Sequence, residues 1–103
     1  MEIYSAGIDL EKDRELLNKV ISALVKSIYE DRRYKNSYVI ENSSYNSIVD
    51  VVKGYYGEFV NLESLVHRYP DLFSAYGIAP RVKEHFYEMA FTYNNKVVYR
   101  IGE

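Results

Sequence analysis

The sequence predicts one α+β domain that is mostly α, with a small β-hairpin at its C-terminal end. Three patterns indicate this. Apolar residues recur at three- and four-residue steps in the first third of the chain, shorter helical patterns follow, and residues 91–101 alternate around an Asn-Asn pair. A chain of 103 residues suits a single domain, which we divide into an N-terminal helical part, 1–35, and a core, 43–103.

The longest predicted helix runs from about Asp9, a suitable N-cap residue, to about Asp31. Its apolar side chains form one wide face. Such a face either covers the core of the domain or also pairs with a second copy of the chain. In the second case the dimerisation residues would be Leu17, Val20, Ile21, Leu24 and Ile28.

A linker over residues 34–44 follows, rich in Asn and Ser, with a brief extended piece at residues 38–40. Ser43 or Ser44 is expected to cap a helix from about Tyr45 to Tyr55. Gly54 and Gly57 are expected to end that helix, because glycine accepts the left-handed conformation at a helix C-terminus.

Residues 59–60 predict a short apolar strand before the next helix. Asn61 is a good N-cap for that helix, which is expected to reach about Tyr69. Pro70 discourages its continuation and opens another turn through Phe73. Gly77 then supplies a positive φ in the connection that follows.

A further helix is predicted from Pro80, which fits a first helical turn, to about Ala90. Its buried side would contain Val82, Phe86, Met89 and Ala90. The chain then turns back at Asn94-Asn95, because Asn tolerates positive φ, and this places Tyr93 opposite Lys96 in a hairpin.

Composition excludes several kinds of site. Cysteine is absent and there are only two histidines, His67 and His85, with no carboxylate cluster around them, so we expect no metal and no other cofactor. The chain has no Gly-rich phosphate loop and no nucleophile elbow. We therefore expect no enzyme and assign no catalytic residue.

Charge and tyrosine content bear on binding. The net charge is −2, and the part after residue 35 has six basic and eight acidic residues, so any attraction to nucleic acid must come from local clustering. The 12 tyrosines either reflect a compositional habit or suit interfaces and contacts to nucleotides. No signal peptide or membrane span is visible, and we expect a cytoplasmic protein.

The order of helix, short strand, helix, turn, helix and hairpin over about 43–103 resembles the winged-helix family, a winged helix-turn-helix here preceded by a long N-terminal helix. The size and composition are also similar to small winged-helix proteins of viruses of hyperthermophilic archaea. The resemblance implies a transcriptional regulator that binds double-stranded DNA in sequence-specific fashion, commonly as a homodimer. The stretch 70–79 is longer than usual for the family.

The resemblance also implies which residues contact DNA. In the family the third helix reads the major groove, which here would present Arg81, Lys83, His85 and Tyr87. The wing would contribute Asn94, Asn95, Lys96 and Arg100, and Arg32, Arg33 and Lys35 could add backbone contacts. Glu84 and Glu88, on the same face, would repel phosphate.

The alternative function is a non-enzymatic protein–protein interaction module on the same scaffold. It would use an acidic, tyrosine-rich surface to bind a host or viral protein. The two hypotheses differ in one requirement. DNA binding needs Arg81, Lys83, Lys96 and Arg100 to converge on one surface, whereas protein binding needs an exposed aromatic patch.

Overall fold

The computed structural model describes residues 10–57 and 60–102, with side chains from Arg14 onward. It confirms an α+β fold. The elements within these residues are α1 (Leu10–Ser27), β1 (Ser37–Glu41), α2 (Asn42–Tyr56), α3 (Leu62–Arg68), α4 (Pro70–Ser74), β2 (Ile78–Pro80), β3 (Glu88–Tyr93) and β4 (Lys96–Ile101).

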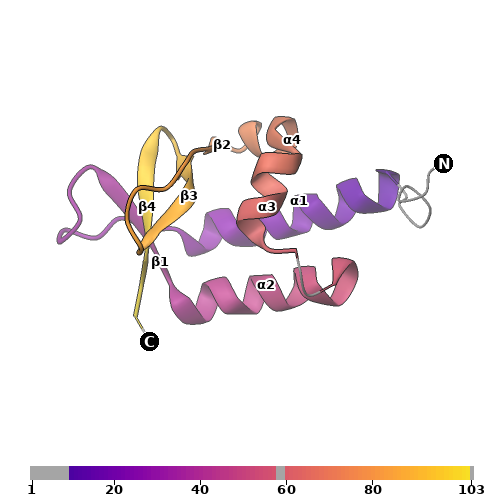
Figure 1. Cartoon of the computed structure of the whole chain (residues 1–103), viewed down its shortest axis with the longest axis horizontal. Helices are drawn as coiled ribbons and strands as arrows, with labels where there is room; N and C mark the ends of the chain where they lie inside the picture. The colour runs from indigo at the N-terminus through magenta and orange to yellow at the C-terminus, as the bar shows by residue number, and fades with distance from the viewer. Residues whose placement is uncertain (1–9, 58–59, 103) are drawn as a thin grey trace.

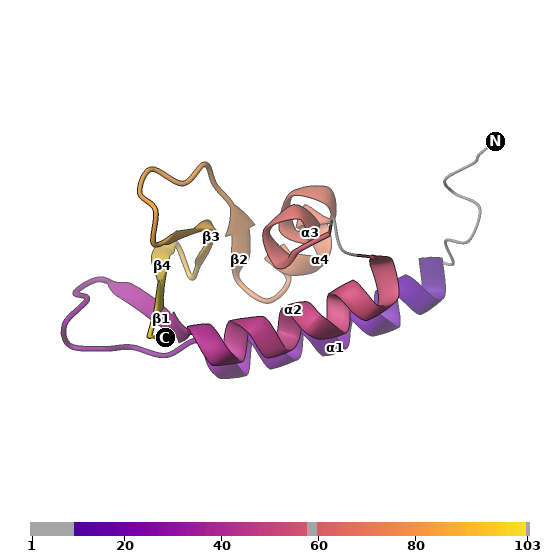
Figure 2. The same cartoon turned by 60° about the horizontal axis from the view of Figure 1, so that its bottom comes forward.

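Two long helices form one layer of the molecule (Figure 1). α1 and α2 lie side by side and run in opposite directions, and the short helices α3 and α4 pack above them beside the sheet (Figure 2). One hydrophobic cluster joins these parts, with Leu24 of α1, Val52 of α2, Phe73 of α4 and Phe91 of β3 all buried in it. The N-terminal helix therefore belongs to the same core as the C-terminal strands.

The sheet has the strand order β1-β4-β3-β2. β1 and β4 are parallel, with Val39 opposite Tyr99, whereas β4, β3 and β2 are antiparallel neighbours. The β3–β4 hairpin is confirmed, with Tyr93 opposite Lys96. Asn94 and Asn95 have φ of 50° and 66°, which is the backbone region that a two-residue hairpin turn requires.

α1 ends at Ser27, four residues before the predicted end at Asp31. The reason is strand pairing. The amide of Tyr29 donates to the carbonyl of Val39 at 3.0 Å, and the amide of Val39 donates back at 2.8 Å. Once Tyr29 is paired with β1, its backbone cannot continue the helix. The expected N-cap, Asp9, lies outside the described residues.

The five residues predicted for dimerisation lie inside the protomer's own core. Leu17, Ile21 and Leu24 are 0% exposed, Val20 is 3% exposed and Ile28 is 7% exposed. They pack against α2, α4 and the sheet instead of forming an exposed stripe. The structure therefore has the first of the two alternatives for this helical face, in which it covers the core of the domain. Contact with a second copy of the chain would have to use side chains other than these five.

The middle helices follow the sequence prediction in type but not in every boundary. α2 begins at Asn42 and its N-cap is Glu41, so Ser43 and Ser44 lie inside the helix. Gly57 ends α2 with φ of 112°, while Gly54 remains helical.

Asn61 caps α3 as predicted, its Oδ1 accepting the amide of Ser64 at 2.8 Å. α4 confirms the turn opened by Pro70, and Gly77 has φ of 86°. Of the strand predicted at 59–60, residue 59 lies outside the described residues and Val60 is not in a strand.

The helix predicted from Pro80 to Ala90 is wrong. Pro80 ends β2 opposite Phe91, residues 81–87 form an irregular loop, and Glu88 already begins β3. Val82 and Phe86, expected on the buried side, are 83% and 82% exposed.

Most residues of the segment 81–90 have good helix propensity, so tertiary pairing overrides the local preference. Glu88 lies opposite Tyr99 of β4, and Met89 is buried. The carbonyl of Ala90 accepts the amide of Arg81.

Candidate functional site

The four residues predicted to read DNA lie on the loop between β2 and β3. Lys83, His85 and Tyr87 are exposed there, whereas the side chain of Arg81 is only 20% exposed. A loop lacks the regular spacing of a helix, so these side chains do not form a single face that could lie along a major groove. Any role of these four residues in DNA binding therefore depends on the positions that the loop gives their side chains, and not on a helix face.

A buried carboxylate holds this loop from inside. Glu88 is 5% exposed, and its Oε1 accepts the backbone amide of Glu84 at 3.0 Å. The same oxygen lies 3.5 Å from Nη2 of Arg81, and Oε2 lies 4.0 Å from Nε2 of His85. The amide hydrogen bond of Glu84, and then the charge of Arg81, lower the pKa of Glu88. The carboxylate therefore stays ionised and fixes the loop.

Beside the exposed Lys83, Glu84 and His85, the loop also presents apolar side chains to solvent. Val82 and Phe86 are the most exposed of these, and Tyr87 is 66% exposed. The rings of Phe86 and Tyr87 meet edge to face, with centroids 5.0 Å apart and planes at 83°. Large apolar side chains exposed together are a feature shared by many interaction surfaces.

The residues predicted for the wing occupy both ends of β4. Asn94 and Asn95 form the exposed turn, and Lys96 follows at the start of the strand. The ammonium group of Lys96 lies 5.6 Å from the ring centroid of Tyr38 in β1. Its charge is therefore held over the β1 side of the sheet and not beside the β2–β3 loop.

Arg100 lies near the other end of the strand and faces the helical layer. Its Nε donates a hydrogen bond to Oδ1 of Asn42, and its Cζ lies 4.5 Å from the ring centroid of Tyr45. Burial raises the pKa of Tyr45 to about 12, so that ring is neutral. Lys96 and Arg100 are separated by about 13 Å along the strand, at roughly 3.3 Å per residue. The four cations named for DNA binding therefore do not converge at one point.

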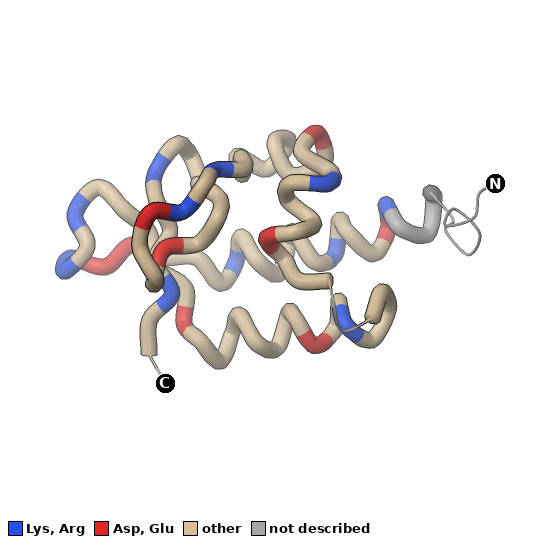
Figure 3. The backbone as a smooth tube through the Cα atoms, in the orientation of Figure 1, with Lys and Arg blue, Asp and Glu red and all other residues tan. Residues whose placement is uncertain are grey.

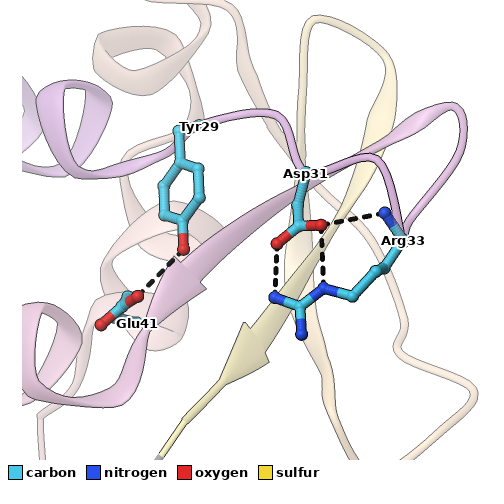
Figure 4. Close-up of polar contacts among 4 residues, drawn as sticks. All are labelled: Tyr29, Asp31, Arg33 and Glu41. Carbon is cyan, nitrogen blue, oxygen red and sulfur yellow. Dashed lines mark hydrogen bonds and ion pairs between the residues drawn. The ribbon is translucent and has the colours of Figure 1, made fainter.

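In a second loop, residues 28–36, the carboxylates of Asp31 and Glu41 accept hydrogen bonds from loop residues (Figure 4). Oδ1 of Asp31 accepts the backbone amide and Nε of Arg33 at 2.9 and 3.0 Å, and Oδ2 accepts Nη2 at 2.6 Å. The hydrogen bonds from Arg33 lower the pKa of Asp31 to about 2. The hydroxyl of Tyr29 donates to Glu41 at 3.0 Å, which raises the pKa of Tyr29.

These two loops flank the face of the sheet that points away from the core. Tyr99 is on that face, because it alternates along β4 with the fully buried Val98. Tyr34 packs on it from the first loop, with ring centroids 5.3 Å apart and planes at 37°. Tyr87 and His85 from the second loop complete a hollow of about 440 Å³, which we call the aromatic hollow.

Cations lie on either side of the aromatic hollow. A neighbouring hollow of about 550 Å³ shares Tyr34 with it, and another of about 340 Å³ shares Tyr87. We call the three together the aromatic–basic surface. Its cations are Arg32, Lys35 and Lys96 on the first side, with Lys83 and Arg100 on the second. In the part of the chain that the structure describes, Arg32, Lys35 and Lys83 form no ion pair.

The charge of the chain is unevenly distributed. Residues 28–41 and 78–102, which build the sheet and its loops, contain seven Lys and Arg against five Asp and Glu, although the whole chain has 13 against 15. Figure 3 shows both basic and acidic segments on the loops at the sheet end. Two of the five acids there, Asp31 and Glu88, are already paired with Arg33 and Arg81. The acidic excess therefore lies on the rest of the molecule.

Sequence reasoning missed the centre of this surface. It named Lys83, His85 and Tyr87, and it named Arg32 and Lys35 as auxiliary contacts, but it did not name Tyr34 or Tyr99. These two rings are 65 residues apart in the sequence and meet because β1 pairs with β4 in parallel. The only signal for them was the high tyrosine content.

The described residues contain no group of three or more His, Asp or Glu that could hold a metal ion. Within the same residues, no helix combines the length and the apolar character that crossing a membrane requires. Comparison of the chain with protein-family models, curated proteins and solved structures found no match. The functional argument therefore rests on the surface itself.

Proposed function

We propose that this protein binds nucleic acid through the aromatic–basic surface. The observation that carries the proposal is that exposed loop cations, Arg32 and Lys35 on one side and Lys83 on the other, flank a cluster of exposed and half-exposed rings. Cations attract the phosphate backbone, and aromatic rings provide platforms for bases.

The acidic net charge does not oppose this proposal, because the surface lies in the part of the chain with a basic excess. A few well-placed cations suffice for local attraction, since binding is driven by release of counterions at the contacted phosphates. Arg32, Lys35 and Lys83 are the cations best suited to this, because they are exposed and form no ion pair among the described residues. Glu30 and Asp31 line the same hollow as Arg32 and Lys35, whereas Lys83 lines a different hollow.

Regulation of transcription through duplex DNA is the form of this function that the winged-helix resemblance favours. In that form the β3–β4 hairpin with Lys96 would contact the backbone, and the β2–β3 loop with Lys83 would replace the expected recognition helix. A homodimeric arrangement would then place two such surfaces on one site.

The test is fluorescence anisotropy of the purified protein with labelled random-sequence nucleic acid, single-stranded and duplex, at about 20 to 200 mM salt. We expect micromolar binding at the lowest salt that weakens as salt rises. The double variant Lys35→Glu with Lys83→Glu should weaken binding at least about tenfold and flatten the salt dependence, because two phosphate contacts are lost.

The matched control is Lys53→Glu. Lys53 is also an exposed lysine, but it lies in the last turn of α2, away from the sheet. Equal weakening by the control and the double variant would reject the proposed surface, and no binding to either form at the lowest salt would reject the function.

Protein binding remains a second candidate because of a specific observation, the 83% and 82% exposure of Val82 and Phe86. Those two side chains lie at the edge of the aromatic–basic surface and would fit an apolar pocket of a protein partner. Replacing both with aspartate distinguishes the functions. A protein-binding loop would lose its partner, whereas nucleic-acid affinity would change mainly through added charge.

A further inference from the structure

The aromatic hollow differs from the two basic hollows beside it. Its walls are rings from three separate segments: Tyr34 from the loop after α1, Tyr87 from the loop before β3, and Tyr99 from β4. Tyr34 and Tyr99 lie in contact at a tilt, and Tyr87 projects 66% of its surface into solvent. Three separate segments of the chain thus bring aromatic rings together around a recess of about 440 Å³.

A recess of this kind suits an unpaired base better than a duplex. In a duplex the faces of the bases are covered by their neighbours, and only base edges are accessible in the grooves. Reading those edges in the major groove takes a protruding helix or a separate two-stranded ribbon. The structure has a loop where the sequence predicted the helix, and its β3–β4 hairpin is built into a sheet between β1 and β2. Ring faces, in contrast, stack on exposed base faces.

The cations are placed to hold the backbone on both sides of such a base. Lys96 and Arg100 share the other face of β4 with the buried Val98, so the cations beside the hollow come from its two loops. Arg32 and Lys35 lie on the first side and Lys83 on the second. A strand of a few nucleotides can therefore cross the hollow with its phosphates near cations at both ends, which is the arrangement of stacking platforms within a charged groove.

We infer that the nucleic acid bound here is single-stranded, with at least one unpaired base stacked in the aromatic hollow on Tyr87 and Tyr99. This inference rests on the proposed function and names its substrate class. It makes base stacking, and not phosphate contact alone, a main source of affinity.

The experiment compares three labelled probes of about 12 nucleotides by anisotropy at about 50 mM salt: single-stranded oligothymidine, a duplex of equal length, and a single strand with abasic sites at its centre. The single strand should bind at least about tenfold more tightly than the duplex or the abasic strand. The abasic probe keeps every phosphate, so the difference isolates the stacked bases.

The same binding measurement is then made with a protein variant, Tyr87→Leu, that lacks one of the rings. Loss of one stacking platform should weaken oligothymidine binding about 5- to 150-fold. Tyr87→Phe keeps the ring and should lose far less. Tyr87 is mostly exposed, so neither change should disturb the fold, and circular dichroism checks this. Tyr55→Leu is the control, because Tyr55 is 45% exposed near the end of α2.

The outcomes separate the two proposals. Duplex or abasic probes bound as tightly as oligothymidine, or equal affinities for Tyr87→Leu and Tyr55→Leu, would overturn the single-strand inference and leave nucleic-acid binding in place. Failure of all three probes to bind, at about 50 mM salt and again at about 20 mM, would overturn both.

Discussion

Glu63 joins α3 to the sheet, and its replacement tests that connection. Its Oε2 accepts the backbone amide of Ala90 at 2.6 Å, at the place where the register of β3 and β4 shifts. The carbonyl of Ala90 contacts Nε2 of His67 at 3.1 Å, one helical turn further along α3. The same carbonyl also accepts the amide of Arg81 at 3.1 Å. Glu63 therefore ties α3 to β3 at its irregular point, by binding the amide of Ala90.

The expected magnitude follows from these contacts. A hydrogen bond to a charged group contributes about 1.5–3 kcal/mol, and Glu63 in the first turn of α3 adds about 0.3–1 kcal/mol through the helix dipole. Glu63→Ala removes both and should cost about 2–3 kcal/mol. Glu63→Gln removes the charge but keeps an acceptor, so it should cost about half as much. The Ala–Gln difference, about 1 kcal/mol, isolates the hydrogen bond.

Urea unfolding followed by circular dichroism measures both variants, with Asp71→Ala as the control. Asp71 is also an acidic residue in a first helical turn, in α4, but it is exposed. If Glu63→Ala costs no more than Asp71→Ala, or if the Ala and Gln variants have the same free energy of unfolding, then the hydrogen bond to Ala90 does not stabilise the strand as argued.

Two further predictions concern the loops and turns around the surface. The carboxyl of Asp31 should titrate near pH 2 in NMR spectra, because hydrogen bonds from Arg33 lower its pKa. The stability that this contact contributes is fully present above the ordinary pKa of 3.8 and is lost as the pH falls through about 2. A titration midpoint near pH 4 would contradict the contact. Gly77→Ala should lower the free energy of unfolding by about 1–2 kcal/mol, because φ is 86° and the added Cβ would lie 2.6 Å from Oδ1 of Asn94. Gly54→Ala, in α2 with no atom within 4 Å of the added Cβ, should instead stabilise by about 0.5–1 kcal/mol, and thermal unfolding of the pair checks both signs.

Local patterns predicted the parts of the fold that local interactions determine. Asn61 caps α3 through a contact three residues away, and the Asn94-Asn95 turn needs only the tolerance of Asn for positive φ. The period of apolar residues in α1 was likewise sufficient to predict a helix with one buried face. In each case the determining partners lie within a few residues of one another.

The segment 81–90 could not be predicted in this way. Its apolar residues fit a helical period, but its conformation is decided by partners elsewhere: β2 pairs with β3, Glu63 binds the amide of Ala90, and Glu88 is buried against Arg81. The centre of the candidate site was missed for the same reason. Tyr34 and Tyr99 come together only through the parallel pairing of β1 with β4.

The most direct test of the central claim is a ¹H–¹⁵N NMR titration of the protein with oligothymidine. The account predicts that amide shifts concentrate on residues 32–36, 83–87 and 96–101, and that α1 and α2 stay unperturbed. Shifts confined to Val82 and Phe86, shifts spread along α1 and α2, or no shifts at millimolar oligonucleotide would contradict nucleic-acid binding by the aromatic–basic surface.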